Sequence, residues 1–381
     1  MHLTKPRIQN TLMKSHYFLG ILTLLIMSCN EKNPTDTSQS FYIGTYTKAE
    51  SKGVYKADFN TDGKFTNLKV MALSENPSFL AYTKDKKFLV AVNESTKEGE
   101  SDGSISSFRI DNDSLVLLDQ IHSHGNNPCH VTITDDNYVI TSNYMGGNVV
   151  LSQLDENGKL TFLDSIQHTG GSDHPRQEAA HVHSTWIHPE TKDVIAVDLG
   201  TNDLWFYQID RSKNALIQKE QQKLAMDSVA GPRHLTFHPK NPNWLYVLNE
   251  LDFSVSLVKY ANGKYAINST TDILFETPEG YNASADIHIS KDGKFLYASH
   301  RGYNTIAVLE IDANDGTLKL VDVHEIPGSW PRNFSLSPDE EYLIYANEWT
   351  NNIFSLKRDA EKGTLTLTDS IQVPNPVMIL F

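Results

Sequence analysis

The stretch Gly231–Asp252, GPRHLTFHPKNPNWLYVLNELD, contains two runs rich in β-branched and aromatic residues. The first run is Arg233–Phe237, the second is Trp244–Glu250, and a polar turn separates them. Runs of this composition on either side of turn residues predict two antiparallel strands. In an antiparallel pair, the start of the first strand lies beside the end of the second. The stretch therefore predicts that Arg233 and Glu250 lie at the same edge of a sheet.

The second of these two strand patterns occurs seven times along the chain. The copies are FYIGTYT (41–47), FLVAVNE (88–94), YVITSNY (138–144), VIAVDLG (194–200), WLYVLNE (244–250), FLYASHR (295–301) and YLIYANE (342–348). The position of Arg233 in the repeat is matched by Ser78, Cys129, His183, Ala285 and Arg332. A repeat of about 50 residues with several strands per unit is typical of a propeller blade.

We therefore predict an all-β fold, a seven-bladed β-propeller with four-stranded blades that occupies residues 41–381. Turn pairs such as Asn157-Gly158 and Asn262-Gly263 are strong hairpin signals between the third and fourth strands. The chain enters this region on a second-type strand, residues 41–47, and ends on a first-type strand, residues 375–381. We expect the C-terminal strand to pair with the N-terminal strands in one composite blade, which would close the ring and remove its exposed edge.

The N-terminal residues have the composition of an export signal. Basic residues precede the apolar run of residues 17–27, as in a secretory signal peptide. The sequence Ile26-Met27-Ser28-Cys29 resembles a bacterial lipobox, in which the cysteine is acylated. We expect a signal peptide over residues 1–28, a lipidated tether over residues 29–40, and a location in the bacterial cell envelope. The alternative is an ordinary signal peptide followed by a chance cysteine.

Composition narrows the partners that the protein is expected to have. Asp and Glu number 47 and Lys and Arg number 33, for a formal net charge of −14. Such a chain repels nucleic acid and an anionic bilayer surface, so we expect no nucleic-acid partner and membrane contact only through the lipid on Cys29. We also expect a monomer. The sequence contains neither a G-x-S-x-G elbow nor a phosphate-binding or dinucleotide-binding glycine motif. Serine hydrolase chemistry and a nucleotide cofactor are therefore unsupported, and we expect no cofactor.

Polar residues recur where the predicted first strands begin and the second strands end. In a propeller these positions collect at one mouth of the central channel. They are His130, His181, His183, Arg233, His234, Asp286, Arg332, Asn333, Glu94, Tyr144, Glu250, Arg301 and Glu348. Because a guanidinium binds carboxylate or phosphate through two hydrogen bonds, arginines converging in an acidic protein indicate an anionic ligand. Ion pairs between blades are the structural alternative, because Asn-Glu recurs at the ends of three second strands.

Two histidines allow two kinds of chemistry. His181 and His183 would share a face of an extended strand, and two histidines at that spacing could bind zinc together with Glu178 or Asp173. A neutral histidine near a carboxylate or arginine would serve equally well as a general base. No cysteine ligand or histidine-rich helix motif accompanies the pair, so we expect no metal.

Several short motifs, in this order and spacing, resemble the lactonase family of seven-bladed propellers, over about residues 40–381. They are Tyr42-Ile43-Gly44-Thr45-Tyr46-Thr47, His181-Val182-His183-Ser184, Gly231-Pro232-Arg233-His234, Asn249-Glu250-Leu251, Ala285-Asp286-Ile287-His288 and His300-Arg301. This family includes propeller-type 6-phosphogluconolactonases and muconate lactonising enzymes. The resemblance implies a catalytic histidine, glutamate and arginines at the mouth, matched here by His183, Glu250, Arg233 and Arg301. The repeat alignment selects His183, but His181 remains an alternative.

The expected function is hydrolysis of a sugar-type lactone, similar to that of a 6-phosphogluconolactonase, and the expected partner is a small lactone or carboxylate. His183 would accept a proton from water, Arg233 and Arg301 would stabilise the oxyanion, and Glu250 would orient the site or relay protons. The other candidate substrate-binding residues are His130, His181, His234, Asp286 and Arg332. Two alternatives remain: a muconate-type cycloisomerase, and a non-catalytic ligand-binding propeller of the cell envelope.

Overall fold

The computed structural model describes residues 1–4, 38–94, 103–112, 114–276 and 279–381. The chain divides into two compact units, residues 1–36 and residues 37–381, and the second unit contains all of the strands. The lipobox at Cys29 and most of the predicted signal peptide lie outside the described residues, so lipidation stays a prediction. The described residues contain no helix that could cross a membrane.

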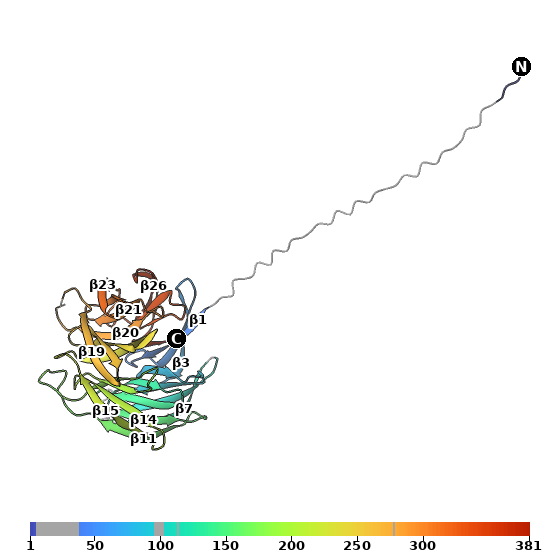
Figure 1. The fold of residues 1–381 in the computed structure, drawn as a ribbon. Helices are drawn as coiled ribbons and strands as arrows, with labels where there is room; N and C mark the ends of the chain where they lie inside the picture. The colour runs from blue at the N-terminus through green and yellow to red at the C-terminus, as the bar shows by residue number, and fades with distance from the viewer. Residues whose placement is uncertain (5–37, 95–102, 113, 277–278) are drawn as a thin grey trace. The chain divides into compact units, whose positions relative to one another are not determined.

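Residues 37–381 form seven four-stranded antiparallel sheets arranged around a central axis (Figure 1). The predicted seven-bladed propeller is therefore confirmed. One blade joins the two chain ends and contains β28 (Pro376–Leu380), β1 (Gln39–Thr45), β2 (Gly53–Phe59) and β3 (Phe65–Leu73). The next three blades contain β4 (Pro77–Tyr82), β5 (Phe88–Asn93), β6 (Ser104–Ile110) and β7 (Leu115–His122); β8 (Pro128–Ile133), β9 (Tyr138–Asn143), β10 (Asn148–Leu154) and β11 (Leu160–Gln167); and β12 (Val182–Ile187), β13 (Val194–Asp198), β14 (Asp203–Asp210) and β15 (Ala215–Ala225).

The last three blades follow the same order from the channel outward. They contain β16 (Pro232–His238), β17 (Asn241–Asn249), β18 (Ser254–Ala261) and β19 (Lys264–Asp272); β20 (Ala283–Ile289), β21 (Phe295–Arg301), β22 (Thr305–Ile311) and β23 (Leu318–Glu325); and β24 (Pro331–Leu336), β25 (Tyr342–Asn347), β26 (Asn352–Arg358) and β27 (Leu365–Gln372).

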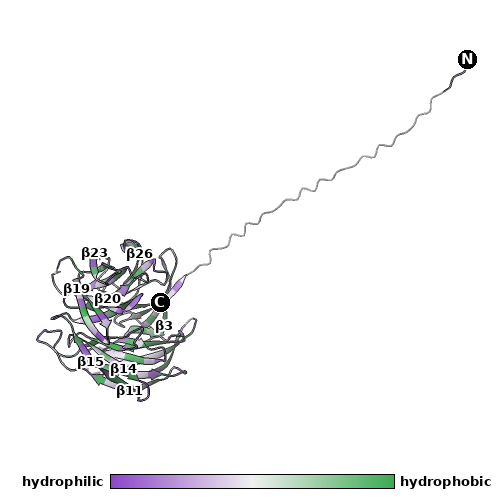
Figure 2. Cartoon of the chain, in the orientation of Figure 1, coloured by the Kyte–Doolittle hydropathy of each residue, from purple (hydrophilic) through white to green (hydrophobic). Residues whose placement is uncertain are grey.

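Burial changes from the second strand of each blade to the fourth. Every residue of β5, β9 and β25 is buried, because these strands have a neighbouring blade on each face, and each strand begins with a run of apolar residues and ends in asparagine. The outer strands β11 and β15 mix buried, half-buried and exposed positions, and Figure 2 shows apolar and polar residues side by side along them. The hydrophobic clusters consequently lie between adjacent blades: one contains Val197 of β13 together with Val247 of β17.

The composite blade closes the ring as the sequence predicts. β28 pairs with β1, with Ile43 opposite Ile379 and Gly44 opposite Met378. Ile379 packs into the core on one side of this blade and Met378 into the core on the other side. A Cβ atom on Gly44 would lie only 2.5 Å from the carbonyl oxygen of Pro77, so the close approach at this seam requires glycine. One short strand thus supports two interfaces between blades.

Deleting Pro374–Phe381 should remove this support and leave β1 with an unpaired edge. We expect the truncated protein to lose most of its unfolding free energy, which is about 5–15 kcal/mol for a typical domain. The measurement is the melting temperature by circular dichroism. A chain lacking only Phe381, which lies beyond β28, is the control and should lose much less. A truncated protein that melts at the wild-type temperature would contradict closure by β28.

Candidate active site

Five of the seven innermost strands begin with an irregularity that re-aims one side chain. The β-sheet register shifts across residues 78, 129, 183, 233 and 332, so each of these residues is unpaired in a β-bulge. A bulge re-aims a side chain that a regular strand would place on the other face, and bulges are common beside active sites. The repeat position identified in the sequence is therefore a bulge position. It presents Cys129, His183, Arg233 and Arg332 toward one end of the channel.

Three of the bulged residues, Cys129, His183 and Arg332, line a cavity of about 450 Å³ at the channel mouth. Its lining contains four cations and three carboxylates, in a protein of net charge −14. The lining residues are Tyr46, Lys48, Glu94, Cys129, Tyr144, Arg176, His183, Glu250, Tyr281, Arg301, Trp330, Arg332, Glu348 and Trp349. A smaller hollow of about 290 Å³ shares Glu94, but among the described residues its lining has no cation or histidine. The mouth cavity is therefore the stronger candidate site.

Glu250 is the centre of the ion-pair network in the cavity. Its carboxylate lies 2.7 Å from an NH2 group of Arg176 and 3.0 Å from an NH2 group of Arg301. Arg233 Nε is 2.9 Å from the same carboxylate, although that N–H is not oriented well enough for a hydrogen bond. The Glu250 side chain is only 2% exposed. Three arginines, two from adjacent blades and one from the segment between β11 and β12, thus converge on one buried carboxylate.

The arginines keep Glu250 ionised. Burial alone would raise the pKa of Glu250, but the three arginines outweigh burial and lower this pKa from 4.5 to about 2. A carboxylate with so low a pKa does not exchange protons near neutral pH. Of the two roles considered for Glu250, orientation of the arginines is therefore favoured over proton relay.

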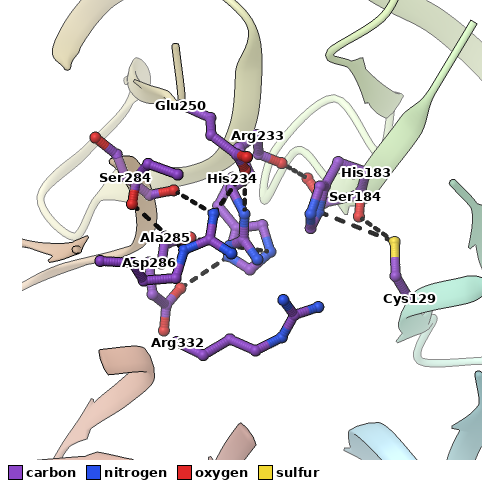
Figure 3. Close-up of polar contacts among 12 residues, drawn as sticks. Cys129, His183, Ser184, Arg233, His234, Glu250, Ser284, Ala285, Asp286 and Arg332 are labelled. Carbon is purple, nitrogen blue, oxygen red and sulfur yellow. Dashed lines mark hydrogen bonds and ion pairs between the residues drawn. The ribbon is translucent and has the colours of Figure 1, made fainter. Parts of the chain in front are cut away.

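Arg233 lies beneath the cavity floor and does not line the cavity. Its side chain is 2% exposed, and one terminal NH donates to the backbone oxygen of Ala285 and to Nε2 of His234 (Figure 3). Burial and Arg301 lower the pKa of Arg233 to about 9, against the opposing effect of Glu250, so its guanidinium remains charged at neutral pH. This position suits a supporting positive charge beneath the site.

His183 lines the cavity and is neutral. Burial lowers its pKa well below the ordinary value of 6.5, and Arg233 and His234 act in the same direction. Its Nδ1 lies 3.9 Å from Sγ of Cys129, and this thiol lies 3.2 Å from the backbone oxygen of His183 (Figure 3). Burial also raises the pKa of the Cys129 thiol, which disfavours the nucleophilic thiolate. The geometry thus offers a neutral imidazole as the proton acceptor.

His181, two residues away, faces different partners. Its Nδ1 lies 3.1 Å from the backbone oxygen of Tyr144, and its Nε2 lies 3.1 Å from Oε1 of Glu178. It does not line the cavity. His181 precedes β12 and His183 is bulged, so the two rings have different polar partners, although both pack against the ring of Tyr144. Within the described part of the chain, no group of three His, Cys, Asp or Glu side chains is arranged to hold a metal ion.

Three of the expected substrate-binding residues lie below the cavity, inside the channel. His234 Nδ1 is 2.8 Å from Oδ1 of Asp286, whose other oxygen accepts from Asn333 at 2.5 Å. The ring of His130 packs 5.7 Å from that of His234. Burial and Arg233 lower the pKa of His234 to about 4, although Asp286 opposes this shift. His130, His234 and Asp286 do not line the cavity, and His234 and Asp286 instead form a buried network behind Arg233.

Arg332 is the arginine that remains available to a ligand. Within the described part of the chain its guanidinium makes no hydrogen bond, and the nearest carboxylate oxygen, on Glu94, is 4.0 Å away. Its guanidinium lies over the ring of Tyr46 at 5.2 Å. Figure 3 shows its side chain apart from the Glu250 network. Since a guanidinium carries five N–H donors, an anion entering the cavity would find Arg332 unsatisfied.

Sequence reasoning did not identify Arg176. It lies in the segment between β11 and β12, the longest of the connections between blades. Besides Glu250, its guanidinium donates to the hydroxyl groups of Tyr281 at 2.9 Å and Tyr144 at 3.1 Å. The length of this segment could have identified it as a candidate from the sequence, because long connections in compact domains frequently contain functional residues. The aromatic residues of the rim, Trp330 and Trp349 among them, were also missed.

The comparison with protein families matches the model "Lactonase, 7-bladed beta-propeller" over residues 40–381. Among similar proteins, a 6-phosphogluconolactonase of Bacillus subtilis is 34% identical over 301 residues, which cover 77% of this chain and 83% of that protein. A 6-phosphogluconolactonase of Formosa agariphila is 33% identical over 306 residues, which cover 77% of this chain and 85% of that protein.

Solved structures resemble the propeller closely. A Bacteroides fragilis protein, provisionally described as a 6-phosphogluconolactonase, superposes with a TM-score of 0.84 at 33% identity and covers 91% of this chain and 98% of its own. The periplasmic gluconolactonase of Pseudomonas aeruginosa superposes with a TM-score of 0.85 at 26% identity and covers 90% of this chain and 98% of its own.

Replacing Glu250 by glutamine should destabilise the fold in a pH-dependent way. Because the folded-state pKa of Glu250 is depressed to about 2 from 4.5, its contribution is present above pH 4.5 and is lost as the pH falls toward 2. The difference in unfolding free energy between wild type and Glu250→Gln should therefore be largest at neutral pH and shrink through this window. Urea unfolding at several pH values measures it.

The matched control is Glu94→Gln in the same cavity. Glu94 accepts one hydrogen bond from the Tyr46 hydroxyl and lies 4.0 Å from a single arginine, so its replacement should cost less stability at neutral pH. An equal cost for both variants would show that the three arginines do not depend on Glu250.

Proposed function

Because the chain belongs to the lactonase family of seven-bladed β-propellers, we propose that it hydrolyses a sugar lactone at the mouth of its channel. The named relatives that are 34% and 33% identical are 6-phosphogluconolactonases, and one structural neighbour is a gluconolactonase. The observation that carries the proposal is the presence, in one cation-rich cavity, of a neutral histidine, His183, and of a guanidinium, Arg332, that makes no hydrogen bond to the described residues.

The proposed reaction begins with attack of water on the lactone carbonyl carbon. His183 accepts a proton from this water as the new C–O bond forms, and the carbonyl oxygen becomes an oxyanion. Arg301, which lines the cavity, stabilises that charge, and Glu250 holds Arg301 in place at 3.0 Å. The bond between the carbonyl carbon and the ring oxygen then breaks. The proton on His183 passes to the ring oxygen, which leaves as a hydroxyl group, and the product is an aldonic acid.

The cationic surroundings have two effects on this reaction. Together with burial, which has the largest effect, they lower the pKa of His183, which keeps it in the proton-accepting form but makes it a weaker base. The negative charge that develops on the oxyanion offsets the neighbouring positive charges and so raises the basicity of His183 when it is needed. Arg332 supplies donors for an anionic group of the substrate or for the carboxylate of the product.

We further propose that the protein is exported and anchored in the bacterial cell envelope by a lipid on Cys29. The lipobox sequence and the apolar run before it support this proposal. The periplasmic location stated for the Pseudomonas neighbour is compatible with it.

Cys29→Ser should move the protein from the membrane fraction to the soluble fraction, because the thiol that would carry the lipid is gone. The melting temperature should not change, since the propeller occupies residues 37–381. Fractionation with immunoblotting measures the first effect, and Ser28→Ala at the neighbouring position serves as the control. Unchanged membrane retention of Cys29→Ser would count against the anchor.

The two cavity residues should affect different kinetic constants. His183→Ala removes the proposed base and should lower kcat on a sugar lactone by roughly 100-fold or more. Arg332→Gln removes a binding cation and should raise KM for a phosphorylated lactone by about 10-fold or more, with a smaller effect on a neutral lactone. Initial rates on 6-phosphogluconolactone and glucono-δ-lactone, corrected for spontaneous hydrolysis, measure both.

His181→Ala is the matched control for His183→Ala. It removes an imidazole two residues away that is bonded to Glu178 and does not line the cavity, so kcat should fall far less. Full activity of His183→Ala would refute the assigned base. If the same preparations converted cis,cis-muconates and did not hydrolyse lactones, the protein would instead be a muconate-type cycloisomerase.

A further inference from the structure

Three aromatic side chains form a stacked group at the rim of the mouth cavity. The rings of Trp330 and Trp349 are 3.9 Å apart and inclined by only 5°. The ring of Tyr281 lies 5.6 Å from Trp330 at 18°. All three residues line the same cavity as His183 and Arg301. The proposed reaction uses none of them, although the guanidinium of Arg301 lies over the Trp330 ring at 5.2 Å.

The backbone at Trp330 shows that the aromatic side chain is retained against a conformational cost. Trp330 has a φ of 72°, in the left-handed region that bulky residues rarely adopt. The residues that precede the same proline in four other blades also have positive φ, and they are Asn76, Asn127, Gly231 and Asn375. Asparagine and glycine tolerate this conformation far better than tryptophan does. Strained residues of this kind cluster at ligand-binding sites, where function compensates for the strain.

The accessible aromatic surface belongs to the two outer members of the group. Trp330 is 6% exposed, whereas Trp349 is 57% exposed and Tyr281 is 63% exposed. Glu348 and Lys48, paired at 3.5 Å, line the cavity beside Trp349. An exposed apolar ring flanked by polar groups suits a sugar ring, whose C–H face packs on the aromatic surface while its hydroxyl groups bond to the polar edge. A purely apolar ligand could not form hydrogen bonds with the adjacent Glu348–Lys48 ion pair.

The cavity is larger than a single lactone ring requires. Its volume of about 450 Å³ lies within the range of roughly 300–1,000 Å³ that holds drug-sized ligands. A monosaccharide lactone is much smaller than such a ligand. If its carbonyl lies between His183 and Arg301, space toward Trp349 remains for a second ring.

We propose that the aromatic rim is a second sugar subsite and that the substrate is the lactone of an oxidised disaccharide. The lactone ring occupies the charged part of the cavity, and the attached glycosyl ring packs on Trp349 and Tyr281. Trp330 holds Trp349 in position by stacking. This proposal rests on the proposed lactonase function, because it extends the same cavity outward.

The kinetic test compares glucono-δ-lactone with cellobiono-δ-lactone, which carries an additional glucosyl ring. Wild-type protein should prefer the disaccharide lactone by at least about 10-fold in kcat/KM. In Trp349→Ala this preference should disappear, chiefly through KM. Phe162→Ala is the control, because Phe162 is another partly exposed aromatic residue, on the outer strand β11 away from the cavity. It should retain the wild-type preference.

A binding measurement separates failure of the subsite from failure of the lactonase function. Isothermal titration with cellobionate and with gluconate needs no turnover. Tighter binding of cellobionate to wild type, with the difference lost in Trp349→Ala, would support the subsite even if no lactone were hydrolysed. Equal binding of the two acids, or a preference that survives in Trp349→Ala, would overturn the subsite while leaving the lactonase proposal intact.

Discussion

The ion-pair network of Glu250 determines how the mouth cavity is organised. A buried carboxylate without partners is very unfavourable, and removing one partner from such a network typically costs about 3–5 kcal/mol. Glu250 follows β17, Arg233 is in β16 of the same blade, and Arg301 ends β21 of the next blade, while Arg176 comes from the segment before β12. The network therefore connects two adjacent blades with the segment that precedes β12. It keeps the arginines fixed before any substrate enters, as electrostatic stabilisation of an oxyanion requires.

This arrangement leaves a cavity with an excess of positive charge. Arg233 adds its charge from below the floor, and Arg332 remains without a hydrogen-bonded partner in the part of the chain that the structure describes. Burial keeps His183 neutral by lowering its pKa, and the same positive charges act in the same direction. A cavity with these properties favours anions and offers an imidazole in its proton-accepting form. Ring closure by β28 contributes indirectly, because rigid blades hold the strand ends that carry these side chains.

The cavity also has two chemically different parts. The charged part surrounds Glu250, and the aromatic part at the rim contains Tyr281, Trp330 and Trp349. The positive φ of Trp330, at a position where four other blades have asparagine or glycine, supports the proposed sugar subsite in the aromatic part. Lactone chemistry explains only the charged part, whereas a substrate with a second sugar ring would use both.

The sequence alone was sufficient for the fold and for bringing Arg233 and Glu250 together at one sheet edge. The repeat of about 50 residues, with strands at both ends, predicts the ring and its closure, and antiparallel pairing places Arg233 and Glu250 at one edge. Only the tertiary structure decided which side chains face the cavity. A β-bulge at the start of the inner strands breaks the alternation of faces, and His183 and His181 have different polar partners. The packing of neighbouring blades buries Arg233 and leaves Arg332 at the cavity surface. Arg176 lies in a connection between blades, whose conformation cannot be predicted from strand periodicity. Alternation along one strand is a local property, whereas burial and ion pairing depend on neighbouring blades.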